Sequence, residues 1–192
     1  MPRPTSLTQL ARVILDVPCL ATILVAIDGP GGAGKSTFAA RLSTALGDAP
    51  IVHTDDFASA DNPIDWWPRT LHEVIEPLAS GRVATYQRYD WPTESLADWI
   101  TVEPGGVVII EGVSASRREW SSCLSYSIFI ETPAEVRLQR GLLRDGDERL
   151  DDWQEWMAAE DAHFARDLAV DRADMVLDGT SQFPDGTSQF PD

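Results

Sequence analysis

The sequence predicts an α/β fold in which a five-stranded parallel sheet is flanked by helices. Three observations support this prediction. Short, almost continuously apolar runs recur along the chain, as in strands that are covered on both faces of a parallel sheet. Segments with helical apolar spacing separate these runs, which is typical of α/β proteins. A glycine-rich segment follows the first strand and leads directly into a helix.

The elements are expected in a regular order. An N-terminal helix should occupy residues 1–17, where Thr5 or Ser6 can cap the first turn and Pro18 ends the last. A second helix should run from Ser36 to Leu46, before Gly47. Helical spacing recurs in two further apolar sets: Leu71, Val74, Ile75, Leu78; and Trp153, Trp156, Met157, Phe164. The five strands are expected at residues 23–27, 51–53, 107–110, 126–130 and 175–177.

The domain organisation is expected to be simple. The 192 residues are enough for one α/β domain, which we place at residues 1–178. Residues 179–192 are expected to be a mobile tail, because the seven residues from Gly179 to Asp185 recur at once from Gly186 to Asp192. A single tandem copy of this length cannot form a solenoid.

The composition limits the partners and the compartment. A net charge of −16 argues against a nucleic-acid partner, which would need clustered Lys and Arg. No apolar run approaches the ~20 residues of a membrane span. Cys19 and Cys123 lie far apart and show no metal-ligand spacing, so a cytoplasmic protein with reduced thiols is the simplest expectation. The sequence gives no indication of the oligomeric state.

The glycine-rich segment from Gly29 to Ser36 reads GPGGAGKS and fits G-x-x-x-x-G-K-[ST], the phosphate-binding loop of P-loop NTPases. Its glycines let backbone amides approach phosphate oxygens, and the following helix N-terminus adds free donors. Lys35 can reach the outer phosphates, and Ser36 can bind magnesium. We therefore expect a P-loop NTPase fold that binds ATP and Mg²⁺. The expected nucleotide contacts are Gly29, Gly31, Gly32, Ala33, Gly34, Lys35, Ser36 and Thr37.

Acidic residues follow two of the expected strands. Ligands of open parallel sheets bind beyond the carboxyl ends of the strands, so Asp55 should lie beside the phosphate loop. A carboxylate there can accept the proton of an attacking hydroxyl or orient magnesium. The alternative is that Asp55 or Asp56 only caps a turn. Glu111 closes another strand and can act on magnesium, with a solvated strand end as the alternative.

Arginines form the main positive cluster of this acidic chain. Arg137, Arg140 and Arg144 would share one face of a helix, and Arg149 follows them. Arginine suits phosphate because it can make bidentate contacts. We expect a mobile lid that closes on the transferred phosphoryl group. The alternative is a surface helix whose arginines pair with nearby carboxylates: Asp145, Asp147 and Glu148.

Aromatic and acidic side chains between the second and third strands can bind a planar or sugar-like substrate. They occur at Asp65-Trp66-Trp67 and from Tyr86 to Trp91, a segment that includes Arg88 and Tyr89. Clustered aromatic residues are more often core, and this is the stronger reading for Trp66, Trp67 and Trp91. His72 and His163 are expected to be structural.

From about Val25 to about Gly179 the chain resembles the uridine kinase-like branch of P-loop kinases. The resemblance rests on Asp28-Gly29 before the loop, D-x-F at Asp55, Y-D-[FW] at Tyr89, Val108 to Gly112, and the lid ending in Arg144-Asp145. It implies transfer of the ATP γ-phosphate to a hydroxyl of a small molecule, with magnesium. It also implies that Asp55 is the catalytic base, that Asp65 and Tyr89 contact substrate, and that Arg144 and Arg149 are lid arginines.

Three features depart from this family, one of which is a shorter segment between Asp55 and Tyr89. Uridine kinases carry a histidine shortly after Y-D-F, whereas this chain continues with Trp91-Pro92-Thr93-Glu94-Ser95. They also carry two adjacent lid arginines, where this chain has Arg140-Gly141. The acceptor therefore stays open among a nucleoside-like compound, a sugar, a pantothenate-like compound and a secondary metabolite. A nucleotide-binding regulatory module without transfer activity is the alternative to an enzyme.

Overall fold

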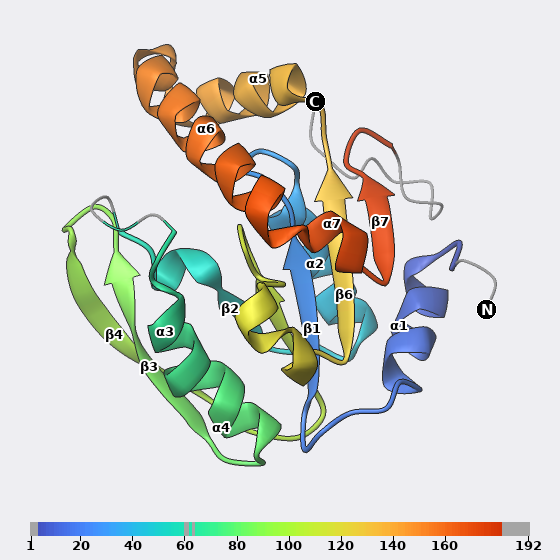
Figure 1. The fold of residues 1–192 in the computed structure, drawn as a ribbon. Coiled ribbons are helices and arrows are strands. Elements are labelled where there is room, and N and C mark those ends of the chain that lie inside the picture. The colour runs from blue at the N-terminus through green and yellow to red at the C-terminus, as the bar shows by residue number, and fades with distance from the viewer. Residues whose placement is uncertain (1–3, 60–61, 63, 182–192) are drawn as a thin grey trace.

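The computed structural model describes residues 4–59, 62 and 64–181 of the chain. Its main sheet consists of five strands in the order β2-β5-β1-β6-β7, and all of its pairings are parallel (Figure 1). The strands are β1 (Ile23–Asp28), β2 (Ile51–His53), β5 (Val107–Glu111), β6 (Tyr126–Glu131) and β7 (Met175–Asp178). The predicted five-stranded parallel sheet is therefore confirmed.

Helices cover both faces of the sheet, because alternate side chains of a strand point to opposite sides. One layer contains α1 (Leu7–Leu15) and α2 (Lys35–Ala45), which share a core with alternate residues of β1, β5 and β6. The other layer contains α3 (Trp67–Thr70), the π-helical η2 (Leu71–Ile75), α4 (Glu76–Ala79) and the 3₁₀ segment η3 (Arg118–Cys123). The π-helical segment ends at Ile75, two residues before Pro77, which has no amide hydrogen to donate.

The N-terminal helix is shorter than the expected residues 1–17. Ser6 is its cap, because the Ser6 Oγ accepts a hydrogen bond of 3.2 Å from the Gln9 amide. The helix ends at Leu15, before Pro18 is reached, and residues 1–3 lie outside the described part. No helix in the described ranges combines the length and the apolar character that crossing a bilayer requires.

An antiparallel hairpin, which the sequence analysis did not predict, packs beside the second helical layer (Figure 1). It consists of β3 (Ala84–Asp90) and β4 (Ser95–Val102). Most residues of β4 are exposed, and large apolar side chains such as Leu96 and Trp99 point to solvent. The period-2 pattern of a half-buried strand is therefore weak in this segment.

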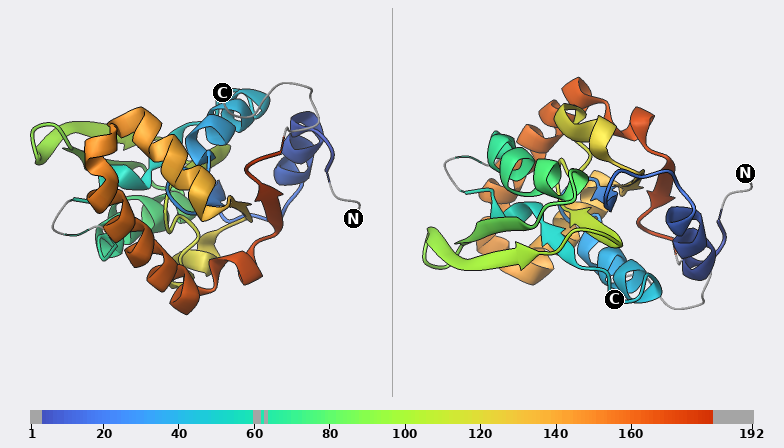
Figure 2. Two further views of the ribbon diagram at one scale, coloured as in Figure 1. Left: turned by 90° about the horizontal axis from the view of Figure 1, so that it is seen from above. Right: turned by 90° about the horizontal axis from the view of Figure 1, so that it is seen from below.

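Two long helices lie over the carboxyl ends of the strands (Figures 1 and 2). They are α5 (Ala134–Asp145) and α6 (Leu150–Asp167), joined by the 3₁₀ turn η4 (Asp147–Arg149). The short helix α7 (Ala169–Arg172) then leads into β7. We call α5, η4 and α6 the lid.

The first copy of the C-terminal repeat begins inside the described structure. The Gly179 amide donates to the Glu131 carbonyl at 2.7 Å, and Gly179 is buried. The rest of the repeat, residues 182–192, lies outside the described residues, so the expectation of a mobile tail there stays a prediction.

Candidate active site

The phosphate loop connects β1 to α2 at the carboxyl edge of the sheet, where its sequence motif predicts it. Gly32 and Gly34 have φ values of +74° and +95°, which side chains rarely adopt. Gly34 immediately precedes α2, and Lys35 and Ser36 form the first turn of that helix. The Lys35 Nζ folds back over the loop and donates to the Pro30 carbonyl at 2.9 Å. Gly29, Gly31 and Ala33 complete the loop, while Thr37 is exposed on α2.

Asp28 fixes the entry to this loop. Its side chain is fully buried at the end of β1, where Oδ1 accepts from the Gly29 amide at 2.7 Å. Its Oδ2 accepts from the amide and the hydroxyl of Ser116 at 2.9 and 2.6 Å. Burial raises the pKa of Asp28, although these bonds oppose the rise. The Ser116 partner lies 88 positions away and could not be found from the motif.

Ser36 and Glu111 form an oxygen-rich pair beside Lys35. The Ser36 hydroxyl donates to Glu111 Oε1 at 3.1 Å, and His53 Nδ1 lies 2.7 Å from Glu111 Oε2. Burial alone would raise the pKa of Glu111, but the hydrogen bond with His53 and the charge of Lys35 hold it below its ordinary value. A hydroxyl and an ionised carboxylate suit Mg²⁺, which uses few protein ligands when it also binds phosphates. The pair therefore fits the expected ion.

The structure separates the roles of Asp55 and Asp56, which lie in the 3₁₀ turn η1 (Thr54–Asp56) after β2. Asp55 faces the charges of Lys35, Glu111 and Arg144, and its side chain keeps contact with solvent. Desolvation by its surroundings raises the pKa of Asp55, and Lys35 opposes this rise. Asp56 instead accepts a hydrogen bond of 2.9 Å from the hydroxyl of Tyr86 on β3.

The arginines of α5 lie in three different environments. Arg140 donates to the Gly32 carbonyl at 3.3 Å and to the Gly179 carbonyl at 3.2 Å, so it contacts the phosphate loop directly. Arg144 donates to Asp145 at 2.7 Å, and its guanidinium lies 5.6 Å from the ring centre of Trp153. Arg137 is buried and pairs with carboxylates of α6.

Arg149 is farther out in the lid. It pairs with Asp152 at 3.0 Å, and both side chains are more than half exposed. Of the carboxylate partners expected in the alternative reading, Asp145 does pair with Arg144, whereas Arg149 pairs with Asp152, which the sequence analysis did not name. The contacts of Arg140 with the loop are not of this kind.

Aromatic residues join the hairpin to the lid next to Asp55. The Trp91 Nε1 donates to the Asp55 carbonyl at 3.1 Å. The Trp91 ring meets Tyr89 edge-on at 5.4 Å and Trp156 of α6 at 5.6 Å. Trp66 is buried in the core, and Trp67 and Trp91 are partly buried and pack against the same core, as the core reading expected.

The two remaining candidates for substrate contact lie on polar surfaces. Arg88 pairs with Asp90 at 3.6 Å and with Asp98 at 3.4 Å within the hairpin. Asp65 is exposed two residues before α3 begins, and its amide donates to Asn62 Oδ1 at 2.8 Å.

An open pocket of about 530 Å³ adjoins the phosphate loop. It is lined by Glu131, Thr132, Pro133, Asp178 and Thr180, at the carboxyl ends of β6 and β7. The Thr132 hydroxyl donates to the Ala33 carbonyl at 3.3 Å, which ties the pocket wall to the loop.

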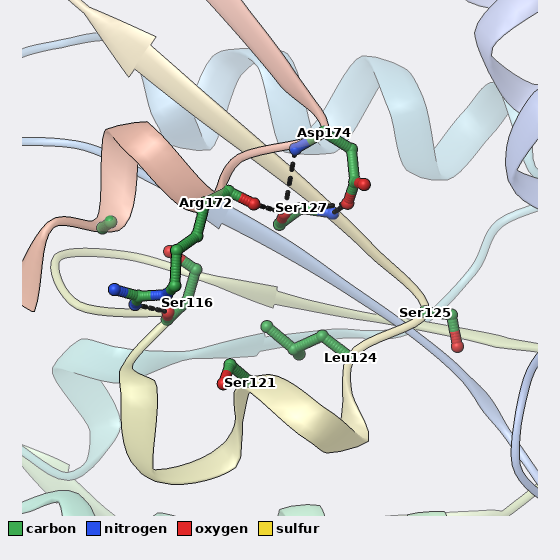
Figure 3. Close-up of a pocket in the computed structure, with 8 residues that line it drawn as sticks. Ser116, Ser121, Leu124, Ser125, Ser127, Arg172 and Asp174 are labelled. Atoms are coloured by element: carbon green, nitrogen blue, oxygen red, sulfur yellow. Dashed lines mark hydrogen bonds between the residues drawn. The ribbon is translucent and has the colours of Figure 1, made fainter.

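A second pocket, of about 230 Å³, lies near the start of β6, between η3 and α7 (Figure 3). Most polar groups of its wall already bind one another. The Arg172 guanidinium donates to the Ser116 carbonyl at 2.9 Å, and the Asp174 carboxylate accepts from the Ser127 amide at 2.8 Å. The pocket adjoining the phosphate loop is therefore the better candidate for a nucleotide base.

Comparisons with known proteins identify the family of the chain. The model of the phosphoribulokinase / uridine kinase family matches residues 58–162, a segment that begins after the phosphate loop. The loop motif therefore supports the assignment independently of that match.

Individual relatives point the same way. A uridine kinase of Halobacterium salinarum is 29% identical over 147 residues, which cover 68% of this chain and 65% of the relative. A phosphoribulokinase of Synechocystis is 28% identical over 172 residues, which cover 81% and 48%. The match thus spans less than two thirds of either relative.

The fold is also found among solved structures. A Bacillus stearothermophilus protein described as a possible uridine kinase superposes with a TM-score of 0.69 at 22% identity, covering 90% of this chain and 97% of the other. This likeness concerns the fold. Together with the family match and the phosphate loop, it leads to one assignment: the chain belongs to the phosphoribulokinase / uridine kinase family.

Proposed function

We propose that this protein is a kinase that transfers the γ-phosphoryl group of ATP to a hydroxyl of a small molecule. One observation supports this proposal: three features meet at one edge of the sheet. They are the phosphate loop with Lys35, the Ser36–Glu111 oxygen pair and the Asp55 carboxylate. A protein that only bound nucleotide would not need a carboxylate facing this lysine.

The residues divide the chemistry among themselves. Loop amides and Lys35 bind and orient the phosphates, and the positive charge of Lys35 stabilises charge that develops in the transition state. Ser36 and Glu111 would hold Mg²⁺, which would neutralise phosphate charge when bound. Asp55 accepts the proton of the acceptor hydroxyl. The base of the nucleotide occupies the pocket lined by Thr132, whose hydroxyl donates to the loop at Ala33.

The acceptor lies on the side of Asp55 that faces the hairpin. Tyr89, Trp91 and Trp156 offer ring faces and edges there, which suits a nucleoside-like compound. A sugar, a pantothenate-like compound or a secondary metabolite would also present a hydroxyl to Asp55. These compounds form the second group of candidate acceptors.

The experiment is a measurement of ADP formation from Mg-ATP with a panel of nucleosides, sugars and pantothenate. The wild-type protein should turn over at least one of them far faster than Lys35→Ala does. Binding of Mg-ATP without transfer to any hydroxyl in a broad panel would instead support a regulatory nucleotide-binding module.

A further inference from the structure

Glu160 of α6 is a buried carboxylate that reaches the phosphate loop. It is 7% exposed, and its Oε2 accepts from the Gly31 amide at 3.0 Å across 129 positions of sequence. The same oxygen lies 3.5 Å from Nη1 of Arg137, which is 4% exposed on α5. One buried oxygen therefore connects the phosphate loop to both helices of the lid.

The Gly31 contact is the closer of the two, and close packing surrounds it. A Cβ at Gly31 would lie 2.9 Å from Glu160 Oε1 and 3.3 Å from the Trp153 ring, so a side chain at residue 31 would push the Glu160 carboxylate aside. The next residue is held as well, since Arg140 of α5 donates to the Gly32 carbonyl. The lid therefore contacts two consecutive residues of the loop, Gly31 through its amide and Gly32 through its carbonyl.

Arg137 does not depend on Glu160 alone. Asp161 Oδ1 lies 3.6 Å from Arg137 Nη2, and the Asp161 side chain is 67% exposed. Glu160 and Asp161 are neighbours on one helix and share a partner, but the contact with Gly31 belongs to Glu160. This difference provides a matched control.

We propose that Glu160 is a positioning residue: by accepting from the Gly31 amide, it fixes the phosphate loop and the lid relative to each other before nucleotide arrives. The proposal rests on the proposed function, because it assumes that the loop binds the phosphates of ATP. Without Glu160, the Gly31 donor would lose its acceptor in a buried interface, and the loop would shift to satisfy it. The shifted loop would present its amides less well to phosphate.

The main test compares three variants by calorimetric titration with Mg-ATP. Glu160→Met keeps the length of the side chain but has no oxygen, and it should weaken binding about tenfold or more, the scale of a lost hydrogen bond to a charged group. Glu160→Gln can place its single oxygen where Oε2 makes both contacts, and it should stay within about threefold of wild type. Asp161→Asn should bind like wild type.

Normal affinity of a folded Glu160→Met protein, or an equal loss in Asp161→Asn, would overturn the proposal. Hydrogen exchange of ¹⁵N-labelled glycine amides without nucleotide is a second measurement. Gly31 should be protected in wild type and exchange about tenfold faster in Glu160→Met, while Gly105, far from the lid, should not change. An unprotected Gly31 amide in the wild-type protein would refute the positioning role of Glu160, even if Glu160→Met failed to fold.

The two hypotheses fail in different ways. If the wild-type protein does not bind Mg-ATP, the proposed function is wrong, and hydrogen exchange of the Gly31 amide still tests its contact with Glu160. If the wild-type protein binds Mg-ATP, but neither the Mg-ATP affinity nor the exchange rate of the Gly31 amide depends on Glu160, only the positioning role of Glu160 is wrong.

Discussion

Two adjacent aspartates have different partners, and this difference can be measured. Asp55 faces Lys35 and Glu111, whereas Asp56 is the hydrogen-bond partner of Tyr86. Asp55→Asn should bind Mg-ATP within a few-fold of wild type and lose about 10²–10⁴-fold in transfer rate, because the amide cannot accept the proton. Asp56→Asn should keep most of the rate. Calorimetry and product formation at saturating ATP test both statements, and the reverse pattern would assign the base to Asp56.

The raised pKa of Asp55 leads to a prediction for the pH profile. A proton acceptor works only when it is ionised, and desolvation keeps Asp55 protonated to a higher pH than the ordinary value of 3.8. The transfer rate should therefore fall as the pH is lowered through a midpoint above 3.8. The residual rate of Asp55→Asn is the control, since this variant keeps every other titrating group. The same acid limb in both proteins would show that another group titrates.

The candidate site was only partly predictable from sequence. The loop, Asp55 and Glu111 could be located because each directly follows an apolar strand, and strand ends meet at one edge of a parallel sheet. Three hydrogen-bonded contacts could not be inferred: Asp28 with Ser116, His53 with Glu111, and Gly31 with Glu160. Each of these pairs joins residues distant in the chain, and neither partner has a local pattern that indicates the other.

Among the elements, the lid depends on one close helix contact. Gly141 of α5 packs directly beneath the ring of Trp153 on α6, and a Cβ there would collide with that ring. This contact gives a physical reason why the chain has glycine where uridine kinases have a second arginine. The helices themselves were predictable from spacing, but this contact between them was not.

Gly141→Ala should therefore destabilise the packing of the lid. Overpacking typically costs about 1–3 kcal/mol, and it should appear as a lower urea midpoint together with weaker Mg-ATP binding. Trp153→Leu in the same chain should restore part of the stability by making room for the methyl group. Equal stability of Gly141→Ala and wild type would show that the two helices can separate without cost.

The strands of the main sheet were predictable from sequence, whereas the hairpin was not. The three central strands β1, β5 and β6 are buried on both faces, and all five strands of the main sheet have short apolar runs, so they were predictable to within a residue. The hairpin β3–β4 is mostly exposed on β4 and carries charged residues such as Arg88 and Asp98. Its strand character depends on pairing between two segments and not on a pattern within either.

At the scale of the whole molecule, the end of the chain bears on the lid. The Gly179 amide binds Glu131 of β6, and its carbonyl accepts from Arg140 of α5. A chain that ends at Asp178 should therefore lose about 1 kcal/mol for each of these bonds and should bind Mg-ATP more weakly. A chain that ends at Ser181 should retain the stability and affinity of the full chain. Thermal unfolding and calorimetry compare the two, and equal behaviour would place the domain boundary at residue 178.

The order of the strands also has a consequence for biosynthesis. The strand that leads into the phosphate loop, β1, is made before both of its neighbours in the sheet, which begin only at Val107 and Tyr126. Pairings between such distant segments form slowly, since the chain between them must first be closed into a loop. While the chain emerges from the ribosome, β1 stays without either neighbour until β5 has been synthesised. The segment with the phosphate-loop motif is therefore translated well before the two strands that hold β1 in the sheet.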